Sequence, residues 1–274
     1  MPLFKEELRY FIRATLDEDI GRGDLTTLAT IAADATLKAE MNARENMVIA
    51  GIDIAEQIIH TVDSAIHVEI LVQDGVEVTA GNVIMRLEGN ARNILTAERA
   101  ALNILQHLSG IATLTRAYVK EIEHTQCRLL DTRKTIPLYR KLAKYAARMG
   151  GAMNHRMRLD DGMLIKDNHI ASVGSVKAAV EAAQSYGSET STIGITVECD
   201  TLEQAQEAVT AGADRLLLDN MTLDMLEDAA QKYKGTVKLE ASGGVTFETI
   251  KMIAETGVDY ISVGRITQSA PAID

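Results

Sequence analysis

The stretch "AGADRLLLDN", residues 211–220, carries the pattern that decides the fold. Its glycine is placed to end a helix, and an aspartate and an apolar run of strand length follow. The same order recurs in "TGVDYISVG", residues 256–264. Helix and strand that alternate in successive matching units are typical of parallel βα repeats.

Four further apolar runs extend this pattern: "CRLLDT" (127–132), "GMLIKDN" (162–168), "GITVECD" (194–200) and "TVKLEASGG" (236–244). Helical stretches such as "TLEQAQEAVTAG" (201–212) and "TFETIKMIAETG" (246–257) separate them. Short apolar strands with intervening helices indicate a parallel sheet that is covered by helices. The sequence therefore predicts an α/β fold containing a TIM-like, incomplete (β/α) barrel.

The first hundred residues differ in pattern, because helices at 4–16 and 51–62 alternate with strand-like segments at 35–46 and 65–72. Residues 73–90 resemble half of a biotinyl or lipoyl-type sandwich, but they lack a lysine where such a carrier would present one. We therefore expect a smaller α+β sandwich domain that serves a structural purpose.

A long helical stretch, residues 95–122, links the two patterns, and we expect Gly110 within it to lie at a close packing contact. The predicted domains are residues 1–108 for the α+β domain and 109–265 for the barrel. The tail, residues 266–274, is expected to pack on the first domain.

Composition narrows the class of protein. The chain has 28 basic and 39 acidic residues, a formal charge of −11, which argues against a broad nucleic-acid-binding face and confines anion binding to a local pocket.

The charged N-terminal segment does not resemble a signal peptide, and no apolar run reaches the roughly 18 residues of a membrane helix. Cys127 and Cys199 lie far apart without metal-ligand spacing. We expect a cytoplasmic protein without nucleic-acid or membrane partners.

Polar side chains lie at the carboxyl ends of the predicted strands, which meet at one rim of a parallel barrel. They are Arg133, Lys134, Lys166, His169, Glu198, Asp219, Glu240 and Ser242. A single such residue is usually a solvated loop residue or a helix cap. Five strand ends with the same feature predict one rim that carries both cations and carboxylates.

The cations on this rim suit an anionic ligand. Arg133, Lys134 and Lys166, with His155 and Arg156 of "NHR", supply donors for carboxylates and phosphates. The small residues of "ASGGV" and "ISVGR" predict turns whose backbone N–H groups hold a phosphate. We expect a pocket for a polyanion.

Glu198 and Asp219 are expected on adjacent strands. Two carboxylates so placed could hold Mg²⁺ or stabilise a developing positive charge. They could equally be salt-bridge partners of Lys166 and Arg133, and the two uses are compatible.

Taken together, many segments resemble the quinolinate phosphoribosyltransferase family, in the same order and nearly from end to end. They are "EDIGRGDLTT", "ERAALNILQHLSGIATLT", "DTRKTIP", "KYA", "GGAMNHR", "LIKDNHI", "VECD", "AGADRLLLDN", "LEASGG" and "GVDYISVG". The resemblance implies transfer of phosphoribose from phosphoribosyl pyrophosphate to quinolinate with decarboxylation, a step of NAD biosynthesis. The products would be nicotinate mononucleotide, pyrophosphate and CO₂.

The resemblance also implies roles for individual residues. Arg133, His155 and Arg156 would bind the two substrate carboxylates, and Lys134 and Lys166 would lie between substrate and pyrophosphate. Glu198 and Asp219 would face the ribose and its Mg²⁺. The 5′-phosphate would be bound by Ser242, Gly243, Gly244 and Gly264. The family completes each site across a homodimer, to which Arg99 of the partner's smaller domain would contribute.

Two positions depart from the family pattern, because Leu138 and Arg158 stand where glycine is common. Leucine should lose the positive φ that glycine allows, and Arg158 would add a cation beside the carboxylate-binding group. Three alternatives remain: a paralogue with a different acceptor, a non-catalytic ligand-binding barrel, and a Schiff-base aldolase with Lys166 as the nucleophile.

Overall fold

The computed structural model describes residues 5–190 and 194–274, which form two compact units. The first unit comprises the described part of 1–116 together with Lys141–Gly151 and Ser269–Asp274. The second comprises Ala117–Arg140 and Ala152–Gln268. Two helices, α4 (Ala91–Ile122) and α5 (Arg140–Met149), begin in one unit and end in the other.

The first unit has the predicted mixed α and β structure. Its antiparallel sheet has the order β1-β5-β3, and a two-stranded sheet pairs β2 with β4. The helix α3 packs inward because apolar residues at three- and four-residue spacing, such as Ile54 and Ile58, are buried on one face. The elements other than α4 and α5 are α1 (Lys5–Ile20), α2 (Leu25–Thr30), β1 (Thr36–Asn42), β2 (Met47–Val48), α3 (Ile52–Val62), β3 (His67–Ile70), β4 (Glu77–Val78) and β5 (Val83–Asn90).

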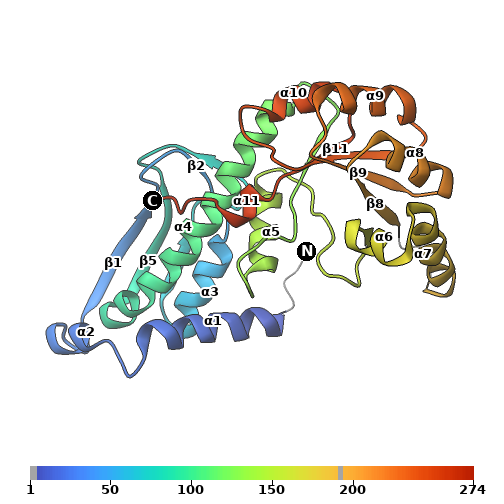
Figure 1. The fold of residues 1–274 in the computed structure, drawn as a ribbon. Helices are drawn as coiled ribbons and strands as arrows, with labels where there is room; N and C mark the ends of the chain where they lie inside the picture. Colours follow the sequence, from blue (N-terminus) through green and yellow to red (C-terminus); the bar gives the residue numbers. More distant parts are fainter. Residues whose placement is uncertain (1–4, 191–193) are drawn as a thin grey trace. The chain divides into compact units, whose positions relative to one another are not determined.

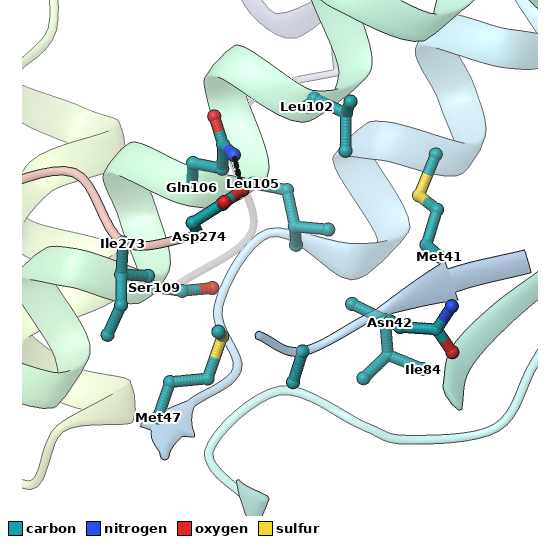
Figure 2. A pocket seen from close by; sticks show the side chains of 11 residues that line it. Met41, Asn42, Met47, Ile84, Leu102, Leu105, Gln106, Ser109, Ile273 and Asp274 are labelled. Carbon is teal, nitrogen blue, oxygen red and sulfur yellow. Dashed lines mark hydrogen bonds between the residues drawn. The ribbon is translucent and has the colours of Figure 1, made fainter. Parts of the chain in front are cut away.

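The C-terminal segment crosses α4 at Gly110. A Cβ atom at this position would lie 1.9 Å from the carbonyl oxygen of Pro271, so only glycine fits and the predicted close contact is confirmed. Beyond it, Gln106 Nε2 donates to Asp274 Oδ1 at 2.8 Å. Figure 2 shows this bond at the edge of a cavity of about 40 Å³, which is lined mainly by apolar side chains such as Leu105 and Ile273.

The second unit contains a parallel sheet of six strands in the order β6-β11-β10-β9-β8-β7. Figure 1 shows β8, β9 and β11 of this sheet. The predicted α/β class is confirmed, with six strands where a complete barrel has eight. Its elements are β6 (Arg128–Leu130), β7 (Met163–Ile165), α6 (Asp167–Val173), α7 (Val176–Thr190), β8 (Ile195–Cys199), α8 (Leu202–Ala211), β9 (Arg215–Asp219), α9 (Leu223–Tyr233), β10 (Lys238–Ser242), α10 (Ile250–Glu255), β11 (Tyr260–Ser262) and α11 (Arg265–Gln268).

The glycine of "AGAD", Gly212, ends a helix as its position in the sequence predicts. Thr201 caps the start of α8 through its side chain, and Gly212 ends the helix in the left-handed region at φ 90°. The strand β9 then begins at Arg215 and lies between β8 and β10. Successive repeats thereby bring the carboxyl ends of the strands to one edge of the sheet.

None of the helices in the described ranges has the length and apolarity that crossing a membrane requires.

Candidate active site

Two arginines form the cationic centre of the second unit. Arg133 follows β6, Arg156 lies in the segment beside that strand, and the Nε atom of each is buried without a hydrogen-bond partner. Burial, and then the positive charge of Arg133, lower the pKa of Arg156. No carboxylate in the described chain forms an ion pair with either. A pair of uncompensated cations with unused donors fits an anion that carries two negative charges.

The segment that carries Arg156 is held by a buried carboxylate. Asp131 is fully buried, and its two oxygens accept from the Asn154 side chain at 2.6 Å and from the His155 backbone N–H at 2.8 Å. Such charge-assisted bonds are among the stronger ones in proteins. Asp131 therefore fixes the backbone immediately before Arg156.

A second buried carboxylate, Glu240 of β10, faces the ring of His155. The imidazole Nδ1 accepts the Arg156 N–H at 2.9 Å, which leaves the ring proton on Nε2, 3.4 Å from Glu240 Oε1. Burial alone would raise the pKa of Glu240, but His155, then Ser262 and Arg215, lower it below the ordinary value. Both ring nitrogens of His155 thus face protein groups.

The predicted cation and carboxylate at the ends of β7 and β8 form an ion pair. Lys166 Nζ lies 2.5 Å from Glu198 Oε2, and Glu198 is mostly buried while Lys166 is half-exposed. On the next strand Asp219 Oδ2 accepts from Asn220 Nδ2 at 2.7 Å. The alternative of Glu198 as a salt-bridge partner of Lys166 is therefore seen in the free protein.

Glu198 and Asp219 offer carboxylate oxygens that suit Mg²⁺, but two carboxylates alone do not make a complete metal site. The described residues contain no group of three or more His, Cys, Asp or Glu side chains that could hold a metal ion by themselves. Mg²⁺ usually keeps several waters and takes one or two carboxylates together with substrate phosphates. These two carboxylates therefore fit a metal that arrives with a pyrophosphate.

The glycine turn after β10 leaves no room for a side chain at Gly243. Gly243 has φ 87°, and a Cβ there would lie 2.2 Å from Asn220 Oδ1, so only glycine is accommodated. Ser242 is paired in register with Asp219, which places the turn beside that carboxylate. The backbone N–H groups of Gly243 and Gly244 have no acceptor within the described ranges. These free donors suit a phosphate.

The turn after β11 differs in its surroundings. At Gly264 an added Cβ would approach the Lys134 side chain to 2.9 Å, so lysine and glycine lie in contact. The helix α11 begins directly at Arg265, whereas α10 begins only at Ile250, six residues after Gly244. The expected strand, glycine and helix order is thus found after β11, while the turn after β10 offers its backbone donors without an adjoining helix.

Arg99 is the predicted site residue that belongs to the first unit. It is exposed on α4, and it has no hydrogen bond or ion pair to any residue that the structure describes. It is thus an unengaged cation on the helix surface.

The two departures from the family pattern have defined geometry. Leu138 adopts φ 64°, so the expectation that leucine loses the positive φ is wrong, and its side chain is 99% exposed. Because the surrounding turn retains the conformation that glycine favours, the leucine carries local strain. Arg158 Nε lies 3.5 Å from Asp160 Oδ1, and both side chains are exposed.

Sequence reasoning missed Arg140, the first residue of α5. Its side chain donates to Thr135 Oγ1 at 3.2 Å, to the Met157 carbonyl at 3.2 Å and to the Arg133 carbonyl at 3.4 Å. The sequence offered one signal, an arginine three residues after Pro137 in a segment already rich in cations.

Comparison with known proteins agrees with this geometry. Family models for the quinolinate phosphoribosyl transferase N-terminal and C-terminal domains match residues 24–109 and 111–274. A nicotinate-nucleotide pyrophosphorylase (carboxylating) of Mycobacterium leprae is 41% identical, over 96% of this chain and 94% of its own. A probable one from Synechocystis sp. is 40% identical, over 96% and 90%.

A solved structure is equally similar. The nicotinate-nucleotide pyrophosphorylase from Francisella tularensis superposes with a TM-score of 0.96 and 41% identity, covering all of this chain and 96% of the other. Both domains, their order and the parallel sheet are therefore shared along the whole length. This chain belongs to the quinolinate phosphoribosyl transferase family.

Proposed function

We propose that this chain transfers phosphoribose from phosphoribosyl pyrophosphate to the ring nitrogen of quinolinate. The C–O bond to pyrophosphate breaks, the new C–N bond forms, and one carboxylate leaves as CO₂ to give nicotinate mononucleotide. The observation that carries the proposal is the pair Arg133 and Arg156, whose buried Nε atoms lack partners and whose charges lack carboxylates in the described chain. Such a pair requires a dianion, and quinolinate carries two adjacent carboxylates.

The proposed roles of the cations follow from their positions. Arg133 and Arg156 bind the two carboxylates, and His155, which faces Glu240, supports this group by accepting the backbone N–H of Arg156. Lys134, in contact with Gly264, and Lys166 offset negative charge on the pyrophosphate as it leaves. The free backbone donors after β10 support a 5′-phosphate site at Ser242, Gly243 and Gly244, with Gly264 beside it.

The carboxylates serve the other half of the reaction. Departure of pyrophosphate leaves positive charge on the ribose ring, which Glu198 and Asp219 stabilise from the ends of adjacent strands. The same two side chains would hold Mg²⁺, which neutralises phosphate charge when bound. Lys166 then exchanges its pairing with Glu198 for the incoming phosphate oxygens.

Decarboxylation needs little from the protein beyond orientation. Once the ring nitrogen is quaternary, it accepts the electron pair that the departing CO₂ leaves behind, and a proton from solvent completes the product. The arginine pair holds the ring while this happens, so no general base is required.

We also propose that the chain acts as a cytoplasmic homodimer in which Arg99 of one copy completes the site of the other. An exposed arginine without a partner in the described residues supports this use, because an unpaired cation is available to an anionic substrate. The aldolase alternative is disfavoured, since an ammonium group 2.5 Å from a carboxylate is not the free amine that attacks a carbonyl.

The test is product formation. The purified chain, quinolinate, phosphoribosyl pyrophosphate and Mg²⁺ should yield nicotinate mononucleotide, pyrophosphate and CO₂ in equal amounts. Absence of all three products would reject the proposal. Nucleotide formation without CO₂, from another pyridine acceptor, would identify a paralogue with a different acceptor.

A further inference from the structure

Arg140 joins the two segments that carry the arginine pair. Its Nη2 donates to the carbonyl of Arg133, and its Nη1 donates to the carbonyl of Met157, the residue after Arg156. Its Nε donates to the Thr135 hydroxyl at 3.2 Å. One guanidinium thus fixes the backbone at both members of the pair.

We propose that Arg140 is a positioning residue that sets the separation of Arg133 and Arg156 and so selects for adjacent carboxylates. This inference rests on the proposed function and deepens it. Two like charges repel, and the charge of Arg133 adds to the effect of burial in lowering the pKa of Arg156. Without a fixed backbone the two side chains would move apart when no substrate is present.

Arg140 acts through other residues rather than on the substrate. Each of its three nitrogens donates to an oxygen of the protein, and it forms no ion pair with any carboxylate in the part of the chain that the structure describes. Arg133 and Arg156 differ, because each keeps a buried Nε without a partner. The substrate is therefore left to those two residues.

Lysine cannot replace this contact. A planar guanidinium reaches three acceptors in fixed directions, whereas an ammonium on a flexible stem reaches one or two without defining their separation. Asp131, two residues before Arg133, also joins the two segments, because its carboxylate accepts from the Asn154 side chain and the His155 backbone. Thr267 in addition holds the first segment by donating to the Lys134 carbonyl at 2.8 Å. Arg140 adds the contacts at the carbonyls of Arg133 and Met157, which Asp131 does not reach.

The experiment compares Arg140→Lys with Arg158→Lys in the full-length protein. Arg158 is a matched control, because it is an arginine in the segment of Arg156 that is exposed and paired with Asp160. Calorimetric titration with quinolinate should show a dissociation constant raised roughly tenfold or more for Arg140→Lys. It should change less than about twofold for the control. The KM for phosphoribosyl pyrophosphate and the melting temperature should stay near wild type for both.

A double variant separates positioning from direct binding. Because Arg140 acts partly through Arg133, the losses of quinolinate affinity in Arg133→Lys and Arg140→Lys should be clearly less than additive in the double variant. Additive losses would overturn the inference, and so would wild-type quinolinate affinity in Arg140→Lys. If Arg140→Lys does not fold, Thr135→Val can be used, because it removes only the contact to Arg140 Nε. Thr135→Val should weaken quinolinate binding about two- to threefold. Unchanged quinolinate binding in Thr135→Val would then overturn the inference.

The wild-type titration separates the two proposals. Failure of wild type to bind quinolinate would reject the proposed function itself. Binding by wild type together with unaltered binding by Arg140→Lys would reject the positioning role alone.

Discussion

Replacement of Leu138 by glycine should stabilise the protein. Leu138 has φ 64°, where the Cβ atom crowds the following carbonyl at a cost of about 1 to 2 kcal/mol. Its side chain is 99% exposed, so removing it sacrifices no buried contact. Glycine also makes the unfolded chain more flexible, which takes back about 0.4 to 1 kcal/mol. The expected net gain in the free energy of unfolding is about 0.5 kcal/mol.

Urea-induced unfolding measures this difference as a shift of the transition midpoint, and a change of this size corresponds to about 1 to 2 °C in melting temperature. Leu138→Ala is the matched control, because it keeps the Cβ atom and its strain while removing the rest of the side chain. Its stability should equal that of wild type.

A clear loss of stability in Leu138→Gly would refute the reasoning. It would mean that the leucine is covered in solution, for example by a second copy of the chain. Repeating the measurement at two protein concentrations distinguishes this case, since stability that comes from association rises with concentration.

Three further predictions concern other parts of the molecule. Glu198→Gln and Asp219→Asn should each lower kcat by roughly a hundredfold or more, while the dissociation constant of quinolinate, measured by calorimetry, changes little. Gly110→Ala should destabilise the protein by about 2 kcal/mol or more in urea unfolding, because the added Cβ would overlap the Pro271 carbonyl; unchanged stability would show that the C-terminal segment is not held there. The folded-state pKa of Glu240 is depressed, so its charge stabilises the fold above the ordinary glutamate pKa and this contribution disappears as the pH falls through the depressed value. As the pH falls, the free energy of unfolding of wild type should therefore decrease more than that of Glu240→Gln. If the difference between the two proteins does not depend on pH, the depressed pKa of Glu240 is contradicted.

Features of local chemistry could be predicted from the sequence. The glycine of "AGAD" ends α8 at Gly212 because few other residues adopt its φ of 90°, and the apolar run after it forms β9. The polar residues at the strand ends follow from the βα repeat alone, and the structure pairs two of them, Lys166 and Glu198. Gly110 could be predicted because a helical glycine is costly unless something packs against it.

Features that depend on tertiary contacts could not be predicted. Arg140 looks like one more cation after Arg133 and Lys134, and only the folded chain brings the Met157 carbonyl to it. Nothing in the sequence around Asp131 indicates burial, yet this carboxylate is fully buried and accepts from the backbone of His155. Leu138 breaks the local rule for positive φ, because propensity alone does not reveal what the surrounding turn imposes.

The central claim is that the arginine pair recognises two carboxylates, and the most direct test compares quinolinate with nicotinate as acceptors. The ratio of their kcat/KM values should favour quinolinate by at least about a thousandfold in wild type, because nicotinate leaves one buried guanidinium unpaired. Arg133→Gln and Arg156→Gln should each reduce that ratio sharply. Equal use of both acceptors by the wild-type protein, or a ratio that neither substitution alters, would contradict the account.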